Sequence, residues 1–78
     1  MNLLLDAFAS IKIRADLRNF LLGLFTPKEI VEFGTRLQII KKLKAGIAQH
    51  KIAQDLKVGV ATVTRGSKEI QKGRFKNI

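Results

Sequence analysis

The sequence contains no cysteine, no tryptophan and no tyrosine, and it has a single histidine and a single proline. Without cysteine, the chain can form neither a disulfide bond nor a thiolate metal site. One histidine, His50, is too few to build a zinc site. The sequence also shows no glycine-rich phosphate loop and no evident acidic pair at catalytic spacing, so we predict that the protein is not an enzyme.

Acidic residues are also few, because 6 Asp and Glu stand against 15 Lys and Arg, giving a formal net charge of +9. Such an excess favours a polyanionic partner, with nucleic acid as the first candidate and an acidic membrane surface as the second. A basic surface that only keeps the protein in solution is the plain alternative.

Long apolar runs are absent, since none approaches the roughly 18 residues that a membrane-spanning helix requires. The N-terminus lacks the pattern of a secretory signal: no basic segment precedes Leu3, and Asp6 interrupts the apolar run. We therefore expect a cytoplasmic protein that does not span a membrane. A basic amphipathic protein that binds a lipid surface or a partner protein is an alternative from another class.

What the sequence does contain is apolar residues, which make up 46% of its 78 positions and include five Phe. A domain of this size buries only about 60% of its unfolded surface. Below roughly 70–80 residues, such domains usually need a metal, disulfides or oligomerisation. We therefore expect a single all-α domain over 1–78 that is stabilised as a homodimer.

The first third of the chain carries two helical stripes of apolar residues. Residues 3–11 and 16–25 each place apolar side chains three and four positions apart, which predicts two amphipathic helices. Asp16 is the expected N-cap of the second helix. We interpret 1–25 as dimerisation helices, because nothing else in so short a chain could cover both of them.

A longer scaffold helix is predicted over 27–45. Thr26 and Glu29 can form a capping box, and Pro27 suits the first helical position. Gly46 is the expected stop of this helix. The residues predicted to point inward are Ile30, Phe33, Leu37, Ile40 and Leu43.

Residues 49–68 match the pattern of a helix-turn-helix, a module that lays its second helix in the DNA major groove. Helices over 49–56 and 60–68 would cross at Ala53, whose small side chain lets the backbones approach. The crossing would be filled by Ile52, Leu56, Val58 and Val63. Lys57 occupies the turn position where glycine is common.

DNA contacts are expected from both of these helices. His50 and Lys51 open the first and could reach phosphates or a base edge. The second begins with small side chains that can approach bases closely, and Lys68 adds a cation near its end. The small residues are Val60, Ala61, Thr62 and Thr64. A basic tail over 73–78 is expected to be frayed. It either adds contacts to DNA phosphates or is solvated and makes no contact with DNA.

Two blocks, FTPKEIVEFGTR over 25–36 and GVATVTRGS over 59–67, form the most specific pattern in the chain. With Leu43 and Gly46 in register between them, they resemble the tryptophan repressor family over about residues 17–69. The resemblance implies an intertwined homodimer that binds double-stranded operator DNA as a transcriptional repressor. It also implies L-tryptophan as the corepressor, with no other cofactor.

The resemblance further implies where tryptophan would bind. Arg36 and Arg65 would sandwich the indole ring, since guanidinium planes stack on aromatic faces. Arg65 would also receive the carboxylate, helped by Thr26. Gly66 would leave room for the ring against the helix backbone.

Near the ammonium group of the ligand, this sequence departs from the family pattern. Backbone carbonyls around Gly23 and Phe25 would accept from the ammonium group, but the family's usual serine nearby is Glu69 in this chain. The family's common arginine at the start of the first reading helix is His50 here, so the operator is expected to differ. The family also continues with a further helix that has no counterpart here, which predicts a smaller dimer interface. A regulator of this type with another ligand, or none, is therefore the alternative.

Overall fold

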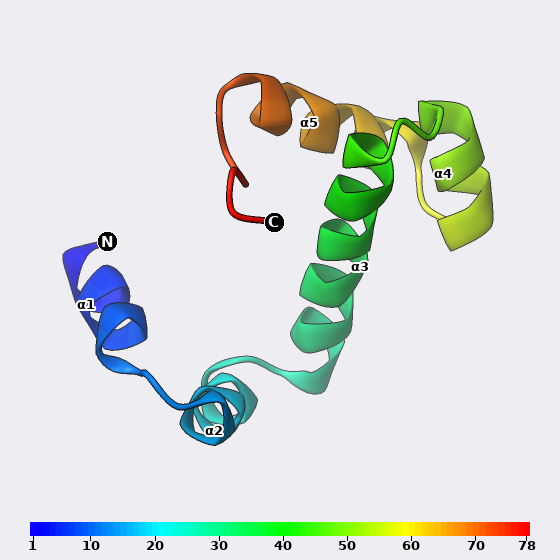
Figure 1. Ribbon diagram of the computed structural model, residues 1–78. Coiled ribbons are helices and arrows are strands. Elements are labelled where there is room, and N and C mark those ends of the chain that lie inside the picture. The colour runs from blue at the N-terminus through cyan, green and yellow to red at the C-terminus, as the bar shows by residue number, and fades with distance from the viewer. The chain divides into compact units, whose positions relative to one another are not determined.

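The computed structural model describes residues 1–78, and its regular structure is entirely helical (Figure 1). Its helices, in order, are α1 (Asn2–Ser10), α2 (Arg14–Leu24), α3 (Pro27–Lys44), α4 (Gln49–Leu56) and α5 (Val60–Gln71). The predicted all-α fold is confirmed. None of these helices has the length and apolar character needed to cross a membrane. The chain forms two compact units, Met1–Val31 and Glu32–Ile78, which are described separately.

The first unit exposes much of its apolar surface. Neither α1 nor α2 contains a buried residue, although the rings of Phe8 and Phe20 pack edge to face with centroids 5.3 Å apart. The predicted N-cap at Asp16 is wrong, because α2 begins at Arg14 and Ile13 occupies the cap position. Asp16 instead lies in the first turn, where its charge complements the helix dipole. Exposed apolar residues include Leu3, Leu4, Leu5, Leu22 and Leu24.

Both ends of α3 are fixed by local hydrogen bonds. The Thr26 N–H donates to Glu29 Oε1 at 3.0 Å, and the Glu29 N–H donates to Thr26 Oγ1 at 3.2 Å. This confirms the predicted capping box. At the other end Gly46 has a φ of +84°, and the Ile47 N–H donates to the Lys42 carbonyl at 3.1 Å. This Schellman arrangement confirms Gly46 as the stop.

The core of the second unit lies where α4 and α5 meet the C-terminal part of α3 (Figure 1). The predicted crossing of α4 and α5 is confirmed, and Ala53 is buried in it. The fully buried side chains are Ile39, Ile52 and Val63, with Leu43, Ile47, Leu56 and Val58 packed around them.

The predicted inward face of α3 is wrong in part. Ile40 is buried as expected, but Phe33 and Leu37 remain 37% and 43% exposed. Ile39, which was not predicted, is only 1% exposed. The reason is that α5 packs beside both Ile39 and Ile40, so the buried face is wider there than a single helical stripe.

The turn between α4 and α5 depends on a residue in the left-handed region. Lys57 has φ 56° and ψ 46°, and the Val58 N–H donates to the Ala53 carbonyl at 3.0 Å. Gly59, by contrast, has an extended backbone with φ −68° and ψ 145° and precedes α5. The turn therefore requires a positive φ at Lys57, where a side chain is sterically disfavoured.

Replacing Lys57 by glycine is expected to raise the free energy of unfolding by about 0.5–1 kcal/mol, because the left-handed penalty disappears while the unfolded chain gains some entropy. Urea denaturation followed by circular dichroism measures this change. Lys57→Ala removes the same charge but keeps the Cβ, so it should give no such gain. An equal gain in both variants would attribute the effect to the lysine charge instead of the backbone.

Candidate functional site

A cavity of about 320 Å³ opens between α3 and α5 within the second unit. Its lining residues are Arg36, Ile39, Thr62, Arg65, Gly66, Glu69 and Phe75. The structure therefore brings together four of the five residues predicted to bind a ligand. The volume lies at the lower end of the range for small-molecule sites, about 300–1,000 Å³, which suits a ligand of amino-acid size.

Gly66 allows α5 to approach α3 closely. A Cβ on Gly66 would lie 3.2 Å from Ile40 Cδ1 and 3.3 Å from Ile39 Cγ2. These distances are shorter than usual carbon contacts, so any larger residue would crowd α3 and narrow the cavity. The glycine thus has a packing role that is independent of any ligand.

Two guanidinium groups border the cavity from opposite helices. Arg36 belongs to α3, and its guanidinium carbon lies 5.4 Å from the centroid of the Phe33 ring in a cation–π contact. Arg65 belongs to α5 and is exposed. Such groups can stack on an aromatic ligand and can hold a carboxylate by paired, charge-assisted hydrogen bonds.

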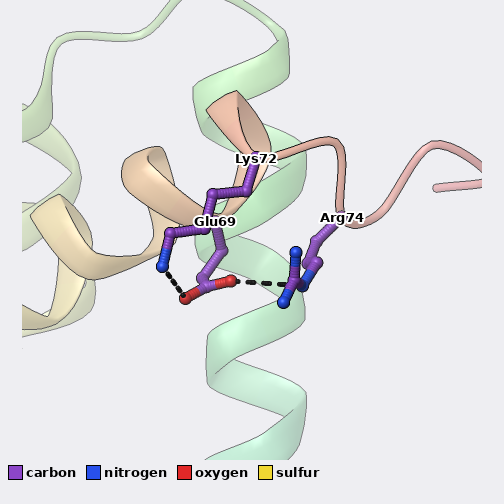
Figure 2. Close-up of polar contacts among 3 residues, drawn as sticks. All are labelled: Glu69, Lys72 and Arg74. Carbon is purple, nitrogen blue, oxygen red and sulfur yellow. Dashed lines mark hydrogen bonds and ion pairs between the residues drawn. The ribbon is translucent and has the colours of Figure 1, made fainter.

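The carboxylate of Glu69 is held by two cations from the residues that follow it (Figure 2). Its Oε1 lies 3.4 Å from Lys72 Nζ, and its Oε2 lies 3.5 Å from Arg74 Nε. The side chain remains 28% exposed, so water screens these pairs and each contributes little to stability. The ion pairs instead affect position, because they connect Glu69 at the rim of the cavity to the tail.

The tail over 73–78 is ordered, so the predicted fraying is wrong. Gly73 ends α5 with a φ of +89°, and the Arg74 N–H donates to the Glu69 carbonyl at 3.1 Å. Lys44 of α3 then donates from Nζ to the carbonyls of Phe75 and Ile78. Sequence reasoning missed this because no periodic pattern connects residues 31 and 34 positions apart.

The other residues predicted to contact the ligand belong to the first unit. Thr26 already has a role there, because its hydroxyl accepts from the Glu29 N–H in the capping box. Any part that Thr26, or the carbonyls around Gly23 and Phe25, have in ligand binding stays a prediction.

The residues predicted to contact DNA lie at the start of α4 and along α5. His50 and Lys51 are exposed in the first turn of α4. Thr64 has a structural contact, since its Oγ1 donates to Gln49 Oε1 at 2.8 Å and joins the two helices. Thr62 lies at the cavity, so its side chain is shared by both predicted surfaces. The remaining exposed positions are Val60, Ala61 and Lys68.

Comparisons with known proteins agree on one family. The family model described as Trp repressor protein matches residues 1–77. The Trp operon repressor homolog of Vibrio vulnificus (strain YJ016) is 43% identical over 49 residues, which is 62% of this chain and 48% of that protein. Those of Vibrio campbellii and Vibrio cholerae have the same identity and cover 49% and 48% of their lengths. The matches thus span about half the length of these relatives. The search of solved structures found no significant match.

Proposed function

Because the chain belongs to the Trp repressor protein family, we propose that it is a DNA-binding transcriptional repressor that uses L-tryptophan as its corepressor. The family consists of transcriptional regulators and not of enzymes. Family membership also argues against the alternative that the protein binds a lipid surface, an alternative that the basic composition alone allowed. A DNA partner accords with the cytoplasmic location expected from the sequence.

The observation that carries the proposal is the cavity between α3 and α5. It is lined by Arg36, Arg65 and Gly66, the residue types that an aromatic amino acid requires for stacking, carboxylate binding and close approach. One wall is α5, whose exposed start would enter the DNA major groove. A ligand in this cavity would fix α5 against α3, and so would set the orientation of the DNA-reading helix.

A homodimer completes this proposal. The first unit has no buried residue in either of its helices and exposes several leucines. Exposed apolar side chains of this kind are those that an obligate homodimer buries in its interface. Two copies would present two copies of α5 to an operator whose half-sites lie about one helical turn apart.

A second candidate is a repressor of the same type with a different ligand. The observation in its favour is Glu69, whose carboxylate lies at the cavity where the family typically has serine. A carboxylate favours a ligand with a positively charged group at that point, and it disfavours one with a negative group there.

Isothermal titration calorimetry with L-tryptophan tests the proposal directly, together with a mobility-shift assay on a selected operator with and without the amino acid. We expect saturable heat and an operator affinity that rises on adding tryptophan. Operator binding that does not respond to tryptophan, with no heat at millimolar ligand, would favour the second candidate. No binding to DNA, with or without tryptophan, together with no heat, would contradict the proposed function as a whole.

A further inference from the structure

We propose that Phe75 forms an aromatic wall of the ligand cavity, contributed by the tail and held there by Lys44. The residues that the family resemblance assigns to tryptophan binding are Thr26, Arg36, Arg65, Gly66 and Glu69, so Phe75 is an addition to that set. The inference rests on the proposed function for the identity of the ligand. It does not depend on that function for the position of the ring.

Several contacts from the tail and from α3 place Phe75 at the cavity. The Phe75 carbonyl accepts a hydrogen bond from Lys44 Nζ, which also donates to the Ile78 carbonyl at 3.1 Å. The preceding residue, Arg74, pairs with Glu69 on the cavity rim (Figure 2). Gly73 reverses the chain with a positive φ, so the residues after α5 fold back. These contacts act on the backbone around Phe75 and on its neighbours, and they leave Phe75 on the border of the cavity.

Phe75 lines the cavity without filling it. The space beside Arg65 and Gly66 amounts to about 320 Å³ with the phenylalanine in place. A second hollow, also of about 320 Å³, has Phe33, Arg36, Leu37, Ile40 and Phe75 as its lining. Phe75 and Arg36 therefore border both spaces, which places the ring beside the guanidinium expected to stack on the ligand.

An aromatic wall beside two guanidinium groups selects for a flat, apolar ligand ring. Rings prefer offset or edge-to-face contact, which adds to the free energy of burying their apolar area. A ligand with an aliphatic side chain would lose this contact. The tail thus sets ring specificity, while the arginines recognise the charge.

Calorimetry with L-tryptophan on three variants tests this wall. Phe75→Ala is expected to weaken binding about fivefold to tenfold, the value of an aromatic contact. Lys44 does not line the cavity, yet Lys44→Met should weaken tryptophan binding about threefold. Without the lysine, the tail conformation that places Phe75 at the cavity is only partly populated. Lys41→Met removes the same charge from an exposed position on α3 and should bind as the parent does. Parent-like affinity in Phe75→Ala would overturn the wall and leave the proposed function standing.

A second measurement needs no ligand. The chain contains no tryptophan, so the Phe75→Trp variant carries a single fluorophore in the tail. We expect its emission to be blue-shifted relative to the urea-unfolded variant, and to move towards the unfolded value when Lys44→Met is added. Emission that equals the unfolded value in native buffer would overturn the wall even if tryptophan binds. Failure of the parent to bind tryptophan would instead count against the proposed function alone.

Discussion

Replacing Arg65 by alanine is expected to lower the affinity for L-tryptophan by about a hundredfold while leaving the fold intact. A charge-assisted hydrogen bond to a carboxylate contributes about 1.5–3 kcal/mol, and guanidinium stacking on a ring adds about 0.5–1 kcal/mol at exposed sites. Each 1.4 kcal/mol corresponds to a factor of about ten. Arg65 is exposed on α5 and alanine is a good helix former, so the thermal melt should change little. Calorimetry gives the affinity.

Two further variants separate the possible causes of that loss. Arg65→Lys keeps the positive charge but loses the planar, paired donors, so we expect it to recover only a minor part of the affinity. Lys51→Ala removes a cation from α4, which does not line the cavity, and should leave tryptophan binding unchanged. If Arg65→Ala bound tryptophan as tightly as the parent, the cavity between α3 and α5 would not be the ligand site.

The features of this fold that depend on local chemistry were predictable from the sequence. The Thr26–Glu29 capping box and the Gly46 stop each involve residues a few positions apart, so the pattern itself contains the interaction. The crossing of α4 and α5 was predictable for the same reason. Its turn forms even with Lys57 in place of glycine, because the buried contacts of Ile52 and Val63 outweigh a local penalty of about 1 kcal/mol.

The features that were missed depend on contacts between distant parts of the chain. Periodicity cannot tell that α5 covers Ile39 as well as Ile40, because that depends on the crossing geometry of two helices. The position of Phe75 depends on Lys44, which lies 31 residues earlier. No local sequence pattern indicates a hydrogen bond between residues so far apart. The sequence therefore predicted a frayed tail, and it did not predict Phe75 at the cavity.

The structure also changes the interpretation of Glu69. From the sequence, this residue was a departure from the family that could pair with a ligand's ammonium group. In the structure its two carboxylate oxygens already lie near Lys72 and Arg74 (Figure 2). A ligand ammonium group would therefore share an occupied carboxylate instead of meeting a free one. The exposed ion pairs can be exchanged at little cost, so the site remains open to a charged ligand.

Operator affinity is expected to fall by about 10³-fold or more between 50 and 200 mM salt, because a dimer that neutralises 6–10 phosphates releases their counterions. In the proposed dimer, Lys51→Ala would remove the one phosphate contact expected from Lys51 in each subunit, so the slope of log affinity against log salt should decrease in magnitude by about 2. Lys41→Ala is the matched control, since Lys41 is exposed and points away from Ile39 on the side of α3 opposite the core. Fluorescence anisotropy over a salt series measures both slopes. Equal slopes for Lys51→Ala and the parent would mean that the start of α4 does not contact the DNA backbone.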